Sequence, residues 1–506
     1  MPEFACINYD LVGIYRTPER EGYAGTLAWG DTVEVLEKTN TYLKVPYYLR
    51  NKDGSLQSEP SPCYIIPRKV TPDEIIVAPE ENKVLRMDFV DVQQGDGSIV
   101  QTPKGKTIII DGGMGNLFAR YLAARYRGSS KDNPQQFDCI VVTHGDADHF
   151  AGLTAIHATE KNDSKSKRLF MYPRRVYHNG LVKRPGKMNG QDLTPKEMFG
   201  ATVPIGNRTI ITDLVDDLTQ TPDTVMNEPF RAWKKALSSY RQRYEGPFGP
   251  MDIRRLAYGD DDAFSFLSDE GIKVEVLGPI PYEKDGIYGL PFLGAPSRNP
   301  RLEDESLDLS DEVFKGTDDS HTINGHSVLL RLTYGNVRLL YTGDMNNQSE
   351  RTLVRQHKEK LSAEVMKVPH HGSHDFSAAF LRAVSPLVSV VSSGDENERV
   401  EYIHPRANLM GALGRYSRVS EPLVFVTELV AFFKYEGYAR PVSDADAQER
   451  GSFIAFSRSA WGIVRVRTDG HRLFVYTDSG KRGQFETYAY TIEDGAVPQA
   501  TKVRAT

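Results

Sequence analysis

Four side chains that can bind metal ions lie within six positions of the stretch THGDADHFAGL, residues 143–153. Imidazole and carboxylate groups together suit zinc, manganese or iron, and a ligand set without thiols argues against a purely structural zinc site. Because so many ligands on one turn cannot all reach one ion, the spacing predicts a centre for two metal ions. The alternative is a polar turn that caps a helix, which needs one Asp rather than two Asp and two His. The four residues are His144, Asp146, Asp148 and His149.

Two more candidate positions occur later in the chain, each after a short apolar run. His370 and His371 stand in KVPHHGSHDF, and Asp344 ends the run LLYTGD. A lone pair of histidines, or a lone Asp after a strand, is more often part of a turn. Three such positions in one chain, each at the end of an expected strand, indicate a single site at one edge of a sheet.

The segments around these residues predict an α/β fold. FDCIVV before the first motif has the composition of a buried strand, and FAGLTAI at its end begins a helix. Strand and helix patterns alternate over residues 84–173 and resume after residue 326. The less regular pattern over residues 174–320 indicates an insertion that contains a helix and a buried strand.

The two ends of the chain predict further units. Residues 1–80 contain short alternating strands separated by turn signals, which favour a small all-β barrel. The pattern at Gly30–Asp31, Val33–Val35 and Leu43–Val45 resembles bacterial SH3-like modules, which implies that a protein partner is bound. We therefore expect an SH3-like barrel at 1–80, a main domain at 84–430 and a β-rich C-terminal extension at 431–506.

The composition is that of an ordinary soluble protein. The 506 residues are 39% hydrophobic and 26% charged, with a mean hydropathy of −0.45. No apolar run reaches the roughly 18 residues that would span a membrane, no secretion signal is visible, and the cysteines match no zinc or disulfide spacing. We therefore expect a cytoplasmic protein without membrane contact. The net charge of −6 gives no general attraction to nucleic acid, so such binding needs a local basic patch.

The motifs HxDxDH, TGD and HHGS, in this order, resemble those of the metallo-β-lactamase superfamily. Asp146 stands where the commonest first motif, HxHxDH, has a second histidine. This variant is similar to the ComEC-type branch, named for the hydrolase domain of a DNA-uptake competence protein. The resemblance covers roughly residues 84–430. Further matches to that branch are DFVDVQQGDGSIV at 88–100, TIIIDGG at 107–113, NGHSVLLRLTYGNVRLLYTGD at 324–344 and IHP at 403–405.

The resemblance implies an αββα sandwich with two divalent metal ions, zinc or manganese, at one edge of the paired sheets. By motif position, His144 and Asp146 would hold the first ion, and Asp344 would bridge to the second. His370 would transfer a proton or contact phosphate, because His371 is the favoured ligand of the two. The second ion would be held by Asp148, His149 and His371, and Asp111 would orient a ligand imidazole.

The first ion lacks one expected ligand, because the family's histidine before the strand that leads to Asp344 is not evident. Asn324 is close to that place, with His321 and His326 on either side. Asn324 and His326 are therefore candidate third ligands. A weak first site, together with the carboxylate of Asp146, would favour manganese over zinc.

The turn DVQQGD, residues 91–96, departs from the branch at one position. Gln93 stands where that branch usually has glycine, and the change is expected to alter the local backbone. Asp91 and Asp96 are expected to fix the turn beside the site rather than to bind metal.

A two-ion centre would lower the pKa of a bridging water and hold phosphoryl oxygens for in-line displacement. The expected catalytic residues are the ligand Asp148 and either His370 or His404, which would give a proton to the leaving oxygen. For His404, a structural role beside Pro405 at a helix start is an equal alternative.

A basic stretch with interleaved aromatic residues, 161–187, follows the first motif. Cations beside aromatic rings are typical of single-stranded nucleic-acid grooves, although a solvated basic loop is an equal alternative. We expect a metal-dependent phosphodiesterase or nuclease that cleaves DNA or RNA. The alternatives are a small-molecule phosphoesterase acting on phosphorylcholine esters or nucleotides, and a non-catalytic scaffold. The partner of the SH3-like module is expected within a bacterial stress or defence assembly. The residues expected to contact nucleic acid are Arg174, Arg175, Lys183 and Arg184.

Overall fold

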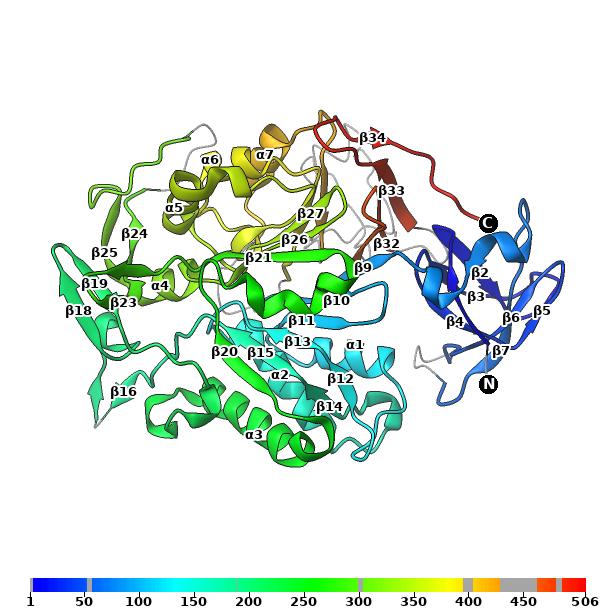
Figure 1. Ribbon diagram of the computed structural model, residues 1–506, viewed down its shortest axis with the longest axis horizontal. Coiled ribbons are helices and arrows are strands. Elements are labelled where there is room, and N and C mark those ends of the chain that lie inside the picture. Colours follow the sequence, from blue (N-terminus) through cyan, green and yellow to red (C-terminus); the bar gives the residue numbers. More distant parts are fainter. Residues whose placement is uncertain are drawn as a thin grey trace, which may run out of the picture.

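The structure, a computed structural model, describes residues 3–51, 57–188, 190–298, 304–394, 404–427, 462–478 and 485–506. Two large sheets form its centre, and a smaller β-rich unit made by the N-terminal strands lies at one end (Figure 1). Ile403 of the IHP match and residues 431–461 of the expected C-terminal extension lie outside the described residues. Within the described parts of the chain, no helix is long and apolar enough to cross a membrane.

The first large sheet contains the strand that precedes the HxDxDH motif. Its order is β20-β15-β13-β11-β10-β9-β31-β32-β33-β34, and neighbouring strands from β11 to β20 are parallel. The strands are β9 (Leu85–Val90), β10 (Gly97–Gln101), β11 (Thr107–Gly112), β13 (Cys139–Val141), β15 (Arg175–His178), β20 (Asp252–Arg255), β31 (Ile463–Thr468), β32 (Arg472–Asp478), β33 (Phe485–Thr491) and β34 (Gln499–Ala500).

The second large sheet carries the later motifs. Its order is β21-β26-β27-β28-β29-β30, and neighbouring strands from β27 to β30 are parallel. The strands are β21 (Ile272–Gly278), β26 (Leu329–Tyr334), β27 (Val337–Tyr341), β28 (Val365–Lys367), β29 (Val388–Val391) and β30 (Leu423–Val426).

The two sheets face each other across a shared apolar core, and helices cover their outer faces (Figure 1). Met87 and Ile110 of the first sheet belong to the same buried cluster as Leu330 and Val365 of the second. Because both faces of each sheet are buried, the strands read as nearly continuous apolar runs. The first sheet is covered by α1 (Leu117–Arg125), α2 (Ala147–Thr159) and α3 (Glu228–Phe248), and the second by α5 (Asn347–His357), α6 (Ala378–Val384) and α7 (Ala407–Tyr416).

Residues 174–320 do not form a separate insertion, because three of their strands belong to the large sheets. β15 and β20 extend the first sheet in parallel with β13, and β21 pairs with β26 in the second. The sequences RVYH and DIRR lack the continuous apolar character of the central strands, so periodicity could not place them in the core. The rest of the segment forms small sheets: β16 (Lys187–Met188) with β17 (Gln191–Asp192); β18 (Thr202–Ile205), β19 (Arg208–Ile211), β22 (Tyr282–Lys284) and β23 (Ile287–Pro291); and β24 (Leu293–Pro296) with β25 (Phe314–Asp318), which leads into α4 (Asp319–Gly325).

The strands after residue 462 are part of the first sheet, not an appendage to it. β31 pairs antiparallel with β9 along its whole length, and β32 and β33 follow as a hairpin. The guanidinium of Arg467 is buried and lies 2.8 Å from the carboxylate of Asp88 on β9. A buried charge needs such a partner, so this ion pair specifies the position of β31.

The N-terminal unit has an apolar core of its own and is attached through charged and aromatic contacts. Trp29 packs with Val84 and Phe474, and the buried carboxylate of Asp10 pairs with Arg472 and Arg504. Its strands form two sheets, β3-β2-β7-β6-β5 and β4-β1-β8. They are β1 (Glu3–Ile7), β2 (Leu11–Tyr15), β3 (Tyr23–Ala28), β4 (Thr32–Val35), β5 (Glu37–Lys38), β6 (Leu43–Tyr47), β7 (Ser61–Ile65) and β8 (Ile76–Val77).

Candidate metal centre

The three motifs meet because parallel strands of both sheets end at the same edge of the core. His144 follows the end of β13, Asp344 follows β27, and His371 follows β28. Side chains beyond the carboxyl ends of parallel strands are where α/β folds usually place their sites. The first turn of α2 adds Asp148 and His149.

Four of these residues converge on one point. The Nε2 atoms of His371 and His149 lie 2.9 and 3.2 Å from Oδ2 of Asp344. The carboxylate of Asp148 lies 3.7 Å from Nε2 of His371 and 4.0 Å from Nε2 of His149. We call Asp148, His149, His371 and Asp344 the closed half of the centre; all but Asp148 are buried.

The outer nitrogens of both imidazoles are held by other groups. Nδ1 of His149 lies 2.8 Å from Oδ2 of Asp111, which also accepts from the hydroxyl of Thr143. Nδ1 of His371 lies 3.1 Å from the carbonyl oxygen of Ser392. Such contacts fix the tautomer and leave Nε2 as the metal-binding atom.

The Nε2 atoms of His144, His149 and His371 are buried and make no hydrogen bond of regular geometry among the described residues; the close group for His149 and His371 is Oδ2 of Asp344, at 3.2 and 2.9 Å. Buried polar atoms rarely go unsatisfied unless a water or an ion completes them. Imidazole nitrogens around a carboxylate are a donor set for a divalent transition-metal ion. The closed half therefore fits such an ion.

The charges of the closed half are strongly shifted. Burial lowers the pKa of His371, but the carboxylates of Asp344 and Asp96 outweigh it and raise the pKa to about 10. For His149, burial is likewise outweighed by Asp344 and Asp111, and its pKa lies well above the usual range. The histidines are held where negative charge gathers, and a cation would replace their protons.

Sequence reasoning missed Lys367, a buried lysine at the end of β28. Its ammonium contacts Asp96, lies 3.6 Å from Oδ1 of Asp344 and donates to the carbonyl of Gly343 at 3.0 Å. Burial lowers the pKa of Lys367, but Asp96 and Asp344 raise it above the ordinary value, so the group stays charged. The available signal was a lone cation in the run EVMKVP, where an apolar residue is expected.

Asp96 also belongs to the site rather than only to its turn. Its Oδ1 lies 3.3 Å from Nδ1 of His371, and its ligand atom groups with those of Asp344 and His371. Gln93 in the same turn has a φ of 65°, a conformation that favours glycine. Gln93 thus adopts a left-handed backbone, and its backbone amide donates to Asp91.

The other half of the centre, formed by His144 and Asp146, is less complete, and we call it the open half. Oδ2 of Asp146 lies 4.0 Å from Nε2 of His144, and Asp146 joins none of the groups of close ligand atoms. Its Oδ1 instead lies 3.3 Å from the ammonium of Lys183. Asp146 is the N-cap residue of α2, but its side chain makes no capping hydrogen bond. Helix capping therefore does not explain this residue.

Of the two candidate third ligands, His326 is engaged elsewhere, whereas Oδ1 of Asn324 is buried and has no hydrogen-bond partner among the described residues. Nε2 of His326 lies 2.7 Å from the carbonyl oxygen of Pro291, so this ring is occupied elsewhere. Nδ2 of Asn324 lies 3.4 Å from Nε2 of His370, which places Asn324 beside His370. His321 pairs with Asp375 at 3.3 Å.

His370 and His404 border the centre. The ring centre of His370 lies 6.1 Å from that of His371 and 6.1 Å from that of His404. His370 and His371 have φ values of 48° and 53°, a strained backbone for residues other than glycine. Burial, followed by the charges of His371 and His370, lowers the pKa of His404 to about 3, so this imidazole is neutral.

The expected nucleic-acid contacts are divided between opposite edges of the first sheet. Arg174 and Arg175 lie at the amino end of β15, whereas the metal centre lies at the carboxyl end of the parallel strand β13. Arg175 lies 3.2 Å from the carbonyl of Asp138, before β13 begins. Of the four expected contacts, only Lys183 and Arg184 follow the carboxyl end of β15, and Arg184 pairs with Asp213.

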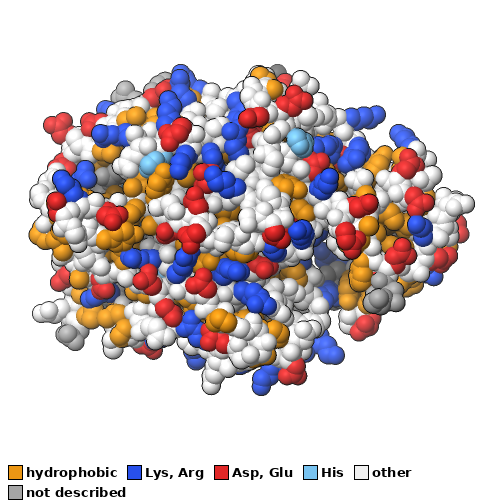
Figure 2. Space-filling model, in the orientation of Figure 1, with side chains coloured by type: hydrophobic (Ala, Val, Ile, Leu, Met, Phe, Trp, Pro, Cys, Tyr) orange, Lys and Arg blue, Asp and Glu red, His pale blue; other side chains and the backbone are white. Residues whose placement is uncertain are grey.

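One face of the molecular surface shows how its charged side chains are distributed. On the face in Figure 2, lysine, arginine and acidic side chains are interspersed.

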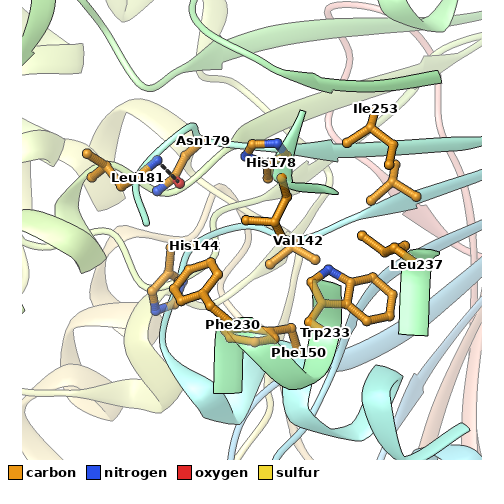
Figure 3. A pocket seen from close by; sticks show the side chains of 13 residues that line it. Val142, His144, Phe150, His178, Asn179, Leu181, Phe230, Trp233, Leu237 and Ile253 are labelled. Atoms are coloured by element: carbon orange, nitrogen blue, oxygen red, sulfur yellow. Dashed lines mark hydrogen bonds between the residues drawn. The ribbon is translucent and has the colours of Figure 1, made fainter. Parts of the chain in front are cut away.

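A narrow apolar pocket lies beside His144, between the first sheet and α3, and is lined by Phe150, Phe230 and Trp233 (Figure 3). Its cavity volume is about 10 Å³, which is room for roughly one water molecule.

Comparisons with known proteins agree with the first motif. A family model described as metallo-beta-lactamase superfamily matches residues 90–171. Over 142 residues the chain is 35% identical to the competence protein ComA of Neisseria gonorrhoeae, a match that covers 27% of this chain. The chain spans only 20% of the length of that curated relative.

A solved structure, the crystal structure of a long form RNase Z from yeast, matches with a TM-score of 0.24 and 9% identity. That match covers 81% of this chain and 50% of the yeast chain, and so low a score supports no argument. The family match spans β10, β11, β13 and α2, the elements that position Asp111 and the HxDxDH motif. Residues 90–171 thus match the metallo-β-lactamase superfamily, and part of the chain is similar to a competence protein.

Proposed function

We propose that this chain is a metal-dependent phosphodiesterase that cleaves DNA or RNA. The observation that carries the proposal is the closed half, in which the buried Nε2 atoms of His149 and His371 converge on the carboxylate of Asp344. The similarity to a competence protein supports nucleic acid as the substrate class.

The residues of the closed half, Asp148, His149, His371 and Asp344, would hold a divalent ion, zinc or manganese. Bound there, the ion would lower the pKa of a water and neutralise phosphoryl oxygens. Asp111 orients the imidazole of His149, and its position away from the centre leaves Nε2 for the ion. Lys367 keeps a fixed positive charge beside the shared carboxylate of Asp344.

His370 is the group that we assign to the substrate. The side-chain amide of Asn324 can only donate through Nδ2, so Nε2 of His370 accepts and Nδ1 carries the proton. Nδ1 of His370 is buried and has no hydrogen-bond partner in the described part of the chain. This N–H is available to donate to a phosphoryl or leaving oxygen. The neutral His404 next to it would serve as a neighbour that shapes the site.

A small-molecule phosphoesterase is the second candidate, and a specific observation favours it. Arg174 and Arg175 lie at the wrong edge for a nucleic-acid groove that ends at the metal centre. A non-catalytic scaffold is the weakest candidate, because the ligand atoms of the closed half converge.

The N-terminal unit would bind a protein partner, in the manner of the SH3-like modules that its sequence resembles. Because it has an apolar core of its own, it is a separate structural unit beside the hydrolase domain. We place the protein in the cytoplasm, as its composition suggests.

Hydrolysis of a panel of substrates tests the proposal. Purified full-length protein with added manganese or zinc would be assayed with single-stranded DNA, duplex DNA, RNA and bis-nitrophenyl phosphate. Cleavage of a nucleic acid that is lost in the Asp148→Ala, His149→Ala double variant supports the proposal. Cleavage of the nitrophenyl ester alone would instead support the small-molecule candidate, and nuclease activity that survives in the double variant would overturn the metal assignment.

A further inference from the structure

The open half contains a lysine at the carboxylate where the family pattern has a metal ligand. The ammonium of Lys183 lies 3.3 Å from Oδ1 of Asp146, and both side chains are largely shielded from solvent, with exposures of 23% and 28%. The other carboxylate oxygen of Asp146 lies 4.0 Å from Nε2 of His144. The ammonium therefore lies beside the two residues expected to bind the first ion.

The backbone around Lys183 is fixed from two sides. Its carbonyl accepts a hydrogen bond at 2.9 Å from the amide of Asn227, the N-cap residue of α3. Two residues earlier, the amide of Leu181 donates to Asn179 (Figure 3). The side chain of Asn179 donates at 3.0 Å to the carbonyl of His326. The backbone that carries Lys183 is thus fixed by α3 and by the segment before β26.

The same segment shows why the open half has too few ligands. His326, held by Asn179 through its backbone, directs its ring to the carbonyl of Pro291 at 2.7 Å. His144 contributes one buried Nε2, and the remaining close partners, His149 and Asp344, already belong to the closed half. While Asp146 is paired with Lys183, the open half has no free carboxylate of its own, and an ion there would have fewer ligands than tight binding needs; removing Lys183 would release Asp146 as a ligand.

We propose that the centre binds a single divalent ion tightly, in the closed half, and that the ammonium of Lys183 takes the place of a second ion at Asp146. This inference rests on the metal-dependent function proposed above. The lysine supplies the positive charge that balances Asp146, and an ion entering the open half would be repelled by it. The change from histidine to Asp at position 146 and the presence of Lys183 then belong together, because an ammonium pairs with a carboxylate and not with a neutral imidazole.

The number of bound ions tests this directly and does not depend on activity. Metal-free full-length protein would be loaded with manganese or zinc, separated from free ions and analysed for metal content, with thermal unfolding as a check on folding. We expect one ion per chain in the wild type and two in Lys183→Met, which removes the charge and keeps the length of the side chain. Lys187→Met, at an exposed lysine paired with Asp192 in the same segment, should still bind one ion.

A matched pair of carboxylate variants tests the inference independently of Lys183. Asp146→Asn should leave one tightly bound ion, whereas Asp148→Asn should weaken its binding at least 100-fold (about the upper effect of residues that only support a ligand). Two tightly bound ions in the wild type, or loss of the ion in Asp146→Asn, would overturn the inference and leave the proposed function standing. Lys183→Met that still binds one ion would overturn the role of the lysine. A wild type without bound metal would overturn the proposed function as well.

Discussion

The closed and open halves of the centre both contain residues of the six-residue motif HxDxDH, but the groups that surround those residues differ. In the closed half, His149 has Asp111 behind it and Asp344 in front, at 2.8 and 3.2 Å. In the open half, Asp146 pairs with Lys183, and the candidate ligand His326 is engaged by a backbone carbonyl. The difference teaches that a metal motif is only as strong as the distant residues that complete it.

The largest expected effect is that of Asp344→Asn, because this carboxylate is shared by both imidazoles of the closed half. We expect loss of the tightly bound ion and a fall in hydrolysis of about 1,000-fold or more, as when a transition-state charge loses its main stabilising group. Metal content and turnover of bis-nitrophenyl phosphate would be measured on the same preparation. Retention of the ion would show that the closed half binds it without the carboxylate of Asp344.

Removing the buried cation of Lys367 is expected to lower the unfolding free energy of the protein more than it lowers catalysis. In Lys367→Met, Asp96 would remain buried and without its cation, which costs about 3–5 kcal/mol in comparable ion pairs. The unfolding free energy of metal-free protein would be measured in urea, with and without added metal. Because a bound ion would supply the missing charge, the loss should shrink when metal is present. An equal loss in both conditions would separate Lys367 from the metal centre.

The support behind the closed half should matter less than its ligands. Asp111→Asn removes the negative charge behind His149 but keeps the shape of the side chain, and we expect metal affinity to fall by about 10–100-fold. Competition with a chelator of known affinity would measure this. An unchanged affinity would mean that the hydrogen bond to Nδ1 does not orient the imidazole.

His326→Ala provides the corresponding test for the open half. Because its ring binds the carbonyl of Pro291, we expect a stability loss of about 1–3 kcal/mol from the unpaired carbonyl and the lost packing. Metal content should not change. A loss of bound metal would make His326 a ligand after all and would contradict the contrast between the halves.

The smallest effect is expected at the far edge of the first sheet. Arg174→Glu combined with Arg175→Glu should change the affinity for single-stranded DNA less than about threefold, because contacts beyond the reach of the substrate add only screened, long-range charge. Binding at two salt concentrations would be compared with that of Lys183→Met. A large loss in the arginine variant would place the nucleic acid across the amino edge and away from the metal centre.

Much of the closed half could be predicted because its signals are local. FDCIVV is short, apolar and β-branched, so the strand end at His144 follows from composition. Asp344 and His371 also follow apolar runs, and parallel strands that end at one edge bring such residues together. By contrast, RVYH and DIRR give no strand signal of their own, and their place in the first sheet depends on neighbours far away in the chain.

Lys367 and Lys183 could not be predicted, because a lysine in a sequence carries no information about its depth or its partner. Lys367 reads as an interruption of an apolar run, and only the opposing loop shows that Asp96 balances it. In the sequence, Lys183 is one of many cations in residues 161–187 and has nothing that distinguishes it from the others. Burial and pairing are properties of the assembled core.

The sequence by itself determined the ligand types, their positions at strand ends and the family of the domain. These follow from residue chemistry and from hydrophobic periodicity, which act over a few neighbours in the chain. Only the tertiary structure decided which half of the centre is complete, which edge the basic residues occupy and that the last strands finish the first sheet. Those outcomes depend on contacts such as Lys183 with Asp146 and Arg467 with Asp88, whose energies exist only once distant segments exclude water together.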